Sequence, residues 1–231
     1  MSDHNGHRQR LKDQYLHNGL DGFTDYQVLE LLLYFAIPRI DTNPIAHDLI
    51  EHFGTLDRVL DAPSSELMQV PGIGPNAAML LALITDAARY YQVRRNDNMK
   101  ILGSVTECGR YMLPYFHGKP YETVLLLCLD AKCKVICCRV VGEGSVNSAS
   151  VPIRRIVELA LTSNASSVVL AHNHPSGIAV PSPEDVVSTR RTAAALAAVD
   201  ITLVDHIIVA DDDFVTLGQS GLYKPEAPNY G

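Results

Sequence analysis

Two histidines and an aspartate, His172, His174 and Asp185, are spaced so that they could bind one metal ion. The histidines lie two residues apart at the end of an apolar run, residues 167–170, which is typical of a buried strand. Side chains two apart in a strand project to the same face. A loop rich in glycine and proline follows, and a helix begins with Asp185 in its first turn. Two imidazoles, a carboxylate and a fourth position left to water are what a catalytic zinc site requires.

Some of these residues also have a purely structural interpretation. The segment from Ser182 to Asp185 has the pattern of a capping box, with proline at the first helical position, and this needs no metal. A capping box does not explain the two histidines. His206, next to Asp205 within a predicted strand, is either a core histidine or a group beside the site.

Strands and helices alternate in the part of the chain that positions these residues. Apolar patterning and turn residues predict helices at 104–115, 152–163 and 183–198, and strands at 121–129, 134–141, 167–172, 201–210 and 214–217. We therefore expect an α/β domain whose sheet is covered by helices. Arg154 and Arg155 begin one helix, where positive charge opposes the helix dipole, so one of them could contact an anion.

Residues 7–98 are predicted to be helical. Thr24 or Asp25 could cap a helix over 26–36, in which an apolar stripe would be buried; it comprises Val28, Leu29, Leu31, Leu32 and Phe35. Further helices are expected at 44–53, 56–60, 64–69 and 75–91. The polar segment 92–100 is predicted to be a linker.

The turn at Gly72–Gly74, within residues 70–91, resembles a helix-hairpin-helix motif. In that motif, backbone N–H groups at a helix N-terminus approach a DNA phosphate. Pro75 and Asn76 stand where a basic residue is common in such turns. Two interpretations follow: a structural turn between packed helices, or weak DNA binding.

Composition limits the classes of partner. The net charge is −7; residues 1–98 contribute −5 and residues 99–231 contribute −2, which does not favour strong binding to a phosphate backbone. No run reaches the roughly 18 apolar residues of a membrane span. The first residues lack the apolar core of a signal peptide, and the odd count of 5 cysteines favours reduced thiols, so we expect a cytoplasmic protein.

The segment His-x-His-Pro followed by Ser182-x-x-Asp185 resembles the JAMM metalloprotease signature. The blocks His172-Asn-His-Pro-Ser-Gly, Val204-Asp-His-Ile-Ile, Gly6-His-Arg-Gln-Arg-Leu and Leu29-Glu-Leu-Leu-Leu are similar to those of the RadC family. The resemblance covers nearly the whole chain. It implies an all-helical domain over 1–98, followed by a mixed-sheet α/β domain of the JAMM, cytidine-deaminase-like type over 101–231.

The resemblance also implies residue roles. His172, His174 and Asp185 would bind Zn²⁺, which lowers the pKa of a bound water towards about 7. A glutamate would accept the water's proton. Glu122, at the start of an early strand, matches the family's placement, and Glu143 at the end of the next strand is the alternative. Ser182 would donate to the oxyanion of the intermediate.

The resulting hypothesis is a zinc-dependent hydrolase, a metallopeptidase or isopeptidase whose zinc-bound water attacks an amide bond in a protein or peptide. The alternative is an accessory module of DNA repair or recombination, which the RadC resemblance suggests. In that case the helical domain binds nucleic acid, and the zinc domain acts on another substrate or is structural.

Overall fold

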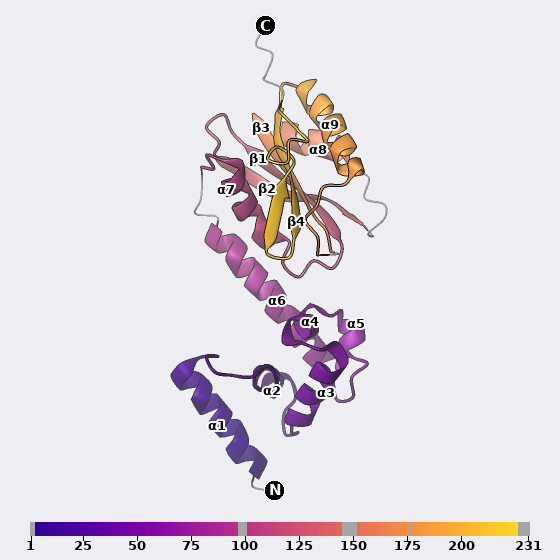
Figure 1. Ribbon diagram of the computed structural model, residues 1–231. Helices are drawn as coiled ribbons and strands as arrows, with labels where there is room; N and C mark the ends of the chain where they lie inside the picture. The colour runs from indigo at the N-terminus through magenta and orange to yellow at the C-terminus, as the bar shows by residue number, and fades with distance from the viewer. Residues whose placement is uncertain (1–2, 97–100, 145–151, 176, 226–231) are drawn as a thin grey trace. The chain divides into compact units, whose positions relative to one another are not determined.

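The computed structural model describes residues 3–96, 101–144, 152–175 and 177–225, which form two compact units (Figure 1). The N-terminal unit is Met1–Ala88 and the C-terminal unit is Arg89–Gly231. Among the described residues, no helix is both long enough and apolar enough to span a bilayer.

The N-terminal unit is helical in its described part, as predicted. Its helices are α1 (Asp3–Asn18), α2 (Asp25–Ala36), α3 (Asn43–Phe53), α4 (Leu56–Asp61), α5 (Ser64–Leu67) and the start of α6 (Pro75–Asn96). Thr24 caps α2 through a capping box with Gln27. Gly54 ends α3 with a φ of 95°, a conformation that glycine adopts without strain. Leucine, isoleucine and alanine side chains of α2 to α6 fill the core of this unit.

The structure corrects two sequence predictions in this unit. Phe35 does not join the buried stripe of α2; it is 73% exposed, whereas Glu30 and Tyr34 are buried instead. The segment 92–100 is not a linker from its beginning, because α6 continues to Asn96; residues 97–100 lie outside the described part.

The Gly72–Gly74 turn packs into the core of the N-terminal unit. Ile73 is buried, and Gly72 has a φ of 90°. A Cβ atom on Gly72 would lie 2.8 Å from the Cδ1 atom of Ile45. Conformation and space thus both require glycine at this position.

The described residues of the C-terminal unit form a five-stranded mixed sheet with the order β2-β1-β3-β4-β5. The strands are β1 (Glu122–Leu129), β2 (Val135–Gly144), β3 (Ser167–Asn173), β4 (Thr202–Ala210) and β5 (Asp213–Thr216). β1 is antiparallel to both β2 and β3, β3 is parallel to β4, and β4 is antiparallel to β5.

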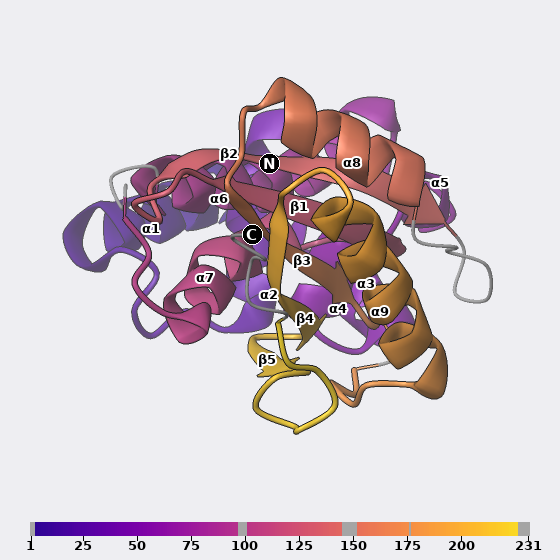
Figure 2. The same cartoon turned by 90° about the horizontal axis from the view of Figure 1, so that it is seen from above.

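Helices cover both faces of this sheet, as expected for an α/β domain (Figure 2). On one face, α8 (Ile153–Thr162) and α9 (Pro183–Ala197) pack on side chains such as Leu126, Leu170 and Ile208. We call it the α9 face. On the other face, which we call the α7 face, α7 (Val105–Met112) and the short 3₁₀ helix η1 (Leu113–Tyr115) pack on Leu125, Leu127 and Ile207.

Candidate metal centre

Strand β3 and the residue directly after it carry the two histidines to the end of the α9 face. Its residues Val168–Ala171 are fully buried, which anchors the strand in the sheet. The backbone N–H of His174 donates to the carbonyl of Val209 at 2.7 Å, so pairing with β4 continues past the last residue of β3. His172 and His174 therefore keep the strand alternation and point to the same side.

Helix α9 supplies the carboxylate from its first turn. Ser182 is the N-cap: its Oγ accepts from the N–H of Asp185 at 3.1 Å and donates to Oδ2 of Asp185 at 2.7 Å. The N–H of Ser182 also donates to that oxygen at 2.7 Å. The capping box expected from the sequence is present, and it fixes the orientation of the Asp185 carboxylate.

The three side chains converge on one point. The two Nε2 atoms of His172 and His174 lie 3.0 Å apart. Oδ1 of Asp185 lies 3.2 Å from Nε2 of His172, and Oδ2 lies 3.7 Å from Nε2 of His174. Bonds of 2.0–2.2 Å to tetrahedral zinc would separate two ligand atoms by about 3.3–3.6 Å. The residue types are those that bind zinc, and the separations of 3.0–3.7 Å lie on either side of these values.

The charge on Asp185 suits a cation. Burial by itself raises the pKa of Asp185, but a hydrogen bond and positive charge from His172, with hydrogen bonds from Ser182, outweigh it and hold the pKa well below its usual value. The group therefore stays a carboxylate at neutral pH. A carboxylate and two neutral imidazoles are the protonation states that bind metal.

Each histidine of the cluster has a partner at its other ring nitrogen. Nδ1 of His174 lies 3.0 Å from the carbonyl of Ile178, which can only accept, so this nitrogen carries the proton and Nε2 keeps its lone pair. Nδ1 of His172 lies 2.8 Å from Nε2 of His206. His206 is fully buried, which is the main reason that its pKa falls well below the usual histidine value. Both interpretations of His206 from the sequence therefore hold, because it is a core residue that also contacts the cluster.

The strand register separates the two candidate glutamates. Val124 pairs with His172, and half-buried Glu122 lies two residues earlier on the same strand, so Glu122 is on the face of the histidines. Glu143 pairs with Thr123, whose side chain belongs to the opposite face. There Glu143 forms an ion pair with Lys119, Nζ to Oε1 2.9 Å.

Other predicted residues lie away from the cluster. Arg154 and Arg155 are both exposed on α8, and neither contributes to the group of three ligands. Thr189, one turn after Asp185, was not singled out by the sequence; its hydroxyl contacts His206 at 2.6 Å. Its spacing of four residues from Asp185 is the sequence signal that could have identified Thr189, because residues at i and i+4 share a helix face.

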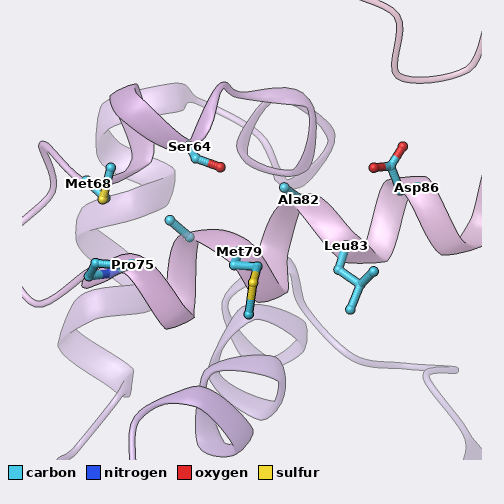
Figure 3. A pocket seen from close by; sticks show the side chains of 8 residues that line it. Ser64, Met68, Pro75, Met79, Ala82, Leu83 and Asp86 are labelled. Carbon is cyan, nitrogen blue, oxygen red and sulfur yellow. The ribbon is translucent and has the colours of Figure 1, made fainter.

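The N-terminal unit has a pocket that is mainly apolar, unlike the cluster of His172, His174 and Asp185 (Figure 3). It has a volume of about 360 Å³ and is open. It is lined mainly by apolar atoms between α5 and the first turns of α6: Ser64, Met68, Pro75, Ala78, Met79, Ala82, Leu83 and Asp86. Asp86 is the only ionisable residue among the described residues that line it, so this pocket offers no cation to a phosphate.

Comparisons with known proteins agree with the sequence resemblance. Residues 102–222 match a family model described as a RadC-like JAB domain. A UPF0758 protein of Fusobacterium nucleatum is 33% identical over 227 residues, which are 95% of this chain and 98% of that protein. A UPF0758 protein of Nitrosomonas europaea is 31% identical over 214 residues, 93% of this chain and 96% of that protein. Neither name states an activity.

Proposed function

The chain belongs to the RadC family, and on that premise we propose that it is a zinc-dependent hydrolase that cleaves an amide or isopeptide bond in a protein or peptide. One observation carries the proposal: Nε2 of His172, Nε2 of His174 and the Asp185 carboxylate converge with separations of 3.0–3.7 Å. These three residues would hold the metal. When bound, zinc lowers the pKa of a coordinated water towards about 7.

Glu122 would carry out the proton transfers of the reaction. Its carboxylate lies on the face of the histidines, at the end of the strand that pairs with β3. A general base there would take a proton from the attacking water and pass it to the leaving amine. Glu143 is directed to the other face, which supports Glu122 as the better candidate.

Ser182 would stabilise negative charge that develops on the substrate carbonyl oxygen. In this structure the Ser182 hydroxyl donates to Asp185, with Oγ 2.7 Å from Oδ2. Donation to an oxyanion therefore requires the hydroxyl to rotate away from Asp185. The same serine would serve helix capping, ligand orientation and catalysis.

Metal analysis tests the site, and a matched pair of variants tests the base. Protein purified without chelator should contain about one zinc per chain, and His174→Ala should lose most of it. Cleavage should then be sought with a peptide and isopeptide library read by mass spectrometry. Glu122→Gln should keep its zinc and lose cleavage, whereas Glu143→Gln should keep both. Zinc-free wild-type protein, or full cleavage by Glu122→Gln, would contradict the proposal.

DNA binding through the Gly72–Gly74 turn is the second candidate function. Apart from the two residues that flank it in the chain, no described residue has a heavy atom within 4 Å of the position that a Cβ atom on Gly74 would take, so a phosphate could approach its backbone. Pro75 begins α6 but has no N–H to donate, and the described lining of the nearby pocket has no basic residue. We therefore propose weak binding only. Fluorescence anisotropy with a labelled duplex should show affinity at low salt that falls steeply as salt rises. No binding at low salt would exclude this function.

A further inference from the structure

A chain of hydrogen bonds runs from the backbone of α9 to His172. The Thr189 hydroxyl donates to the carbonyl oxygen of Asp185 at 2.5 Å. The same hydroxyl lies 2.6 Å from Nδ1 of His206, and Nε2 of His206 lies 2.8 Å from Nδ1 of His172. Thr189 and His206 are fully buried and His172 is 7% exposed, so water does not compete for these groups.

The backbone carbonyl fixes every proton in this chain. A carbonyl only accepts, so Thr189 must use its single hydroxyl proton there. Nδ1 of His206 must then donate to the Thr189 oxygen. A neutral imidazole has one N–H, so Nε2 of His206 accepts, and the donor must be Nδ1–H of His172. Nε2 of His172, 3.0 Å from Nε2 of His174 and 3.2 Å from Oδ1 of Asp185, is then the ring nitrogen that can bind a metal, which would displace any proton that Nε2 shares with Asp185.

The reverse arrangement, in which His206 donates to His172, would require a His206 ring that is protonated on both nitrogens and therefore charged. If His206 carried protons on both nitrogens, its Nε2–H would donate to His172, whose own proton would move to Nε2 and block metal binding. The His206 ring is fully buried, and burying a charge without a paired countercharge is costly. Among the described residues, its ring nitrogens contact only Thr189 and His172.

A β-bulge brings His206 to the correct face of the sheet. Val168 pairs with Leu203, but Val169 pairs with Asp205, so β4 holds one extra residue between these pairs. Without that residue, strand alternation would turn His206 to the α7 face. The Asp205 carboxylate holds the bulge, because its Oδ1 accepts from the N–H of His206 at 2.7 Å and of Gly218 at 2.9 Å.

We propose that His206 and Thr189 are positioning residues that hold His172 in the tautomer with its proton on Nδ1, so that Nε2 is presented to a metal. The inference rests on the proposed function for the identity of the bound ion. The tautomer itself is a property of the metal-free protein.

Ring ¹⁵N chemical shifts of the metal-free wild type read this tautomer directly. We expect a protonated Nδ1 on both His172 and His206 and an unprotonated Nε2 on His206 at neutral pH. The result needs no variant, so a folding defect cannot obscure it. A wild-type spectrum with Nδ1 of His172 unprotonated would overturn the inference.

A matched pair of variants at Thr189 tests this chain of hydrogen bonds at a residue that would contact neither metal nor substrate. Thr189→Val removes the acceptor for Nδ1–H of His206, so the proton of His172 should shift towards Nε2. Zinc affinity, measured by competition with a chromogenic chelator, should fall by about 10–100-fold, as for other groups that orient a metal-binding histidine. Thr189→Ser keeps the hydroxyl and should retain both the tautomer and the affinity.

His206→Gln and His206→Leu provide a second pair. The glutamine amide oxygen can accept from His172 and should preserve most of the affinity, whereas leucine cannot accept. Equal zinc affinities for wild type, Thr189→Val and His206→Leu would overturn the inference and leave the proposed function intact. A wild type that binds no zinc would count against the proposed function, and the ring tautomers would still decide this inference.

Discussion

Replacing Ser182 by alanine should lower both the stability of the C-terminal unit and its affinity for zinc. The hydroxyl of Ser182 makes two hydrogen bonds: it accepts from the N–H of Asp185 and donates to Oδ2 of Asp185. Only the second bond orients a proposed metal ligand. Ser104 provides a matched control, because it caps α7 by accepting from the N–H of Glu107 at 3.2 Å.

The two serines should differ in the size of the effect. Loss of an N-cap hydroxyl costs about 0.5–2 kcal/mol, which is the whole effect expected for Ser104→Ala. Ser182→Ala also loses a hydrogen bond to a carboxylate, worth about 1.5–3 kcal/mol. The lower end applies because the N–H of Ser182 still donates to the same oxygen. We expect Ser182→Ala to cost about 1.5 kcal/mol more than Ser104→Ala, or about 3–6 °C in Tm for a chain of this size.

Chemical denaturation followed by NMR signals from β3 and β4 measures the stability of this unit alone. Chelator competition measures zinc affinity. Ser182→Ala should weaken it by about 10-fold, since one hydrogen bond instead of two then orients the Asp185 carboxylate, and Ser104→Ala should leave it unchanged. The reasoning is refuted if the two variants lose equal stability and bind zinc equally well.

Three further predictions concern other parts of the chain. Gly72→Ala should destabilise the N-terminal unit by about 1–2 kcal/mol in urea titrations, because its φ is 90° and the new Cβ would lie 2.8 Å from a side-chain atom; Gly74→Ala, with open space around it, should be nearly neutral. Glu30→Ala should cost about 1–3 kcal/mol, because it removes a buried carboxylate that accepts from three side chains and leaves the buried Tyr34 hydroxyl without that acceptor, and Glu30→Gln should cost less; equal losses would contradict this. Exposed Cys133 should react with a thiol reagent at neutral pH, and buried Cys108 only on unfolding. Burial raises the pKa of Cys108 to about 12, so its contribution to stability is full below about pH 8.5 and is lost as the pH rises towards 12; Cys108→Ala should flatten the alkaline decline of stability.

The elements of the C-terminal unit were predictable because each has a local signal. The apolar run before His172 identifies a buried strand, and a serine followed by proline and two acids identifies the start of α9. The two histidines and Asp185 could be assigned to one cluster for the same reason: strand alternation fixes the direction of the first two, and the helix start fixes the third.

The errors occur where burial depends on tertiary contacts. Phe35 is apolar yet 73% exposed, because the core-facing side of α2 is shared with Glu30 and Tyr34. The charge of Glu30 is accommodated by partners from three places in the chain: Tyr34 on the next turn, His7 in α1 and Asn43 in α3. Local hydrophobicity cannot reveal such partners, so the pattern alone favoured Phe35 as a buried residue.

The contact between His206 and His172 was hidden for a different reason. Counting by twos along β4 from Leu203, which lies on the α9 face, places His206 on the α7 face. The bulge reverses this parity, and it is held by Asp205, the residue directly before His206. In this chain, the Asp205–His206 pair marks a β-bulge because the Asp205 carboxylate accepts from backbone N–H groups. This bonding brings the histidine to the other face of the sheet.

Helix α9 carries both a proposed metal ligand, Asp185, and two residues that orient the cluster, Ser182 and Thr189. Ser182, Asp185 and Thr189 are spaced by three and then four residues, so all three lie along one side of the helix. The first turn orients the Asp185 carboxylate through Ser182, and the carbonyl of Asp185 itself begins the chain of bonds that runs through Thr189 and His206 to His172. A shift of α9 along its axis would therefore disturb the carboxylate and the His172 tautomer together. Thr189→Val and Ser182→Ala should for this reason be non-additive in zinc affinity, because each removes a hydrogen bond that ties a proposed ligand to the first turns of α9.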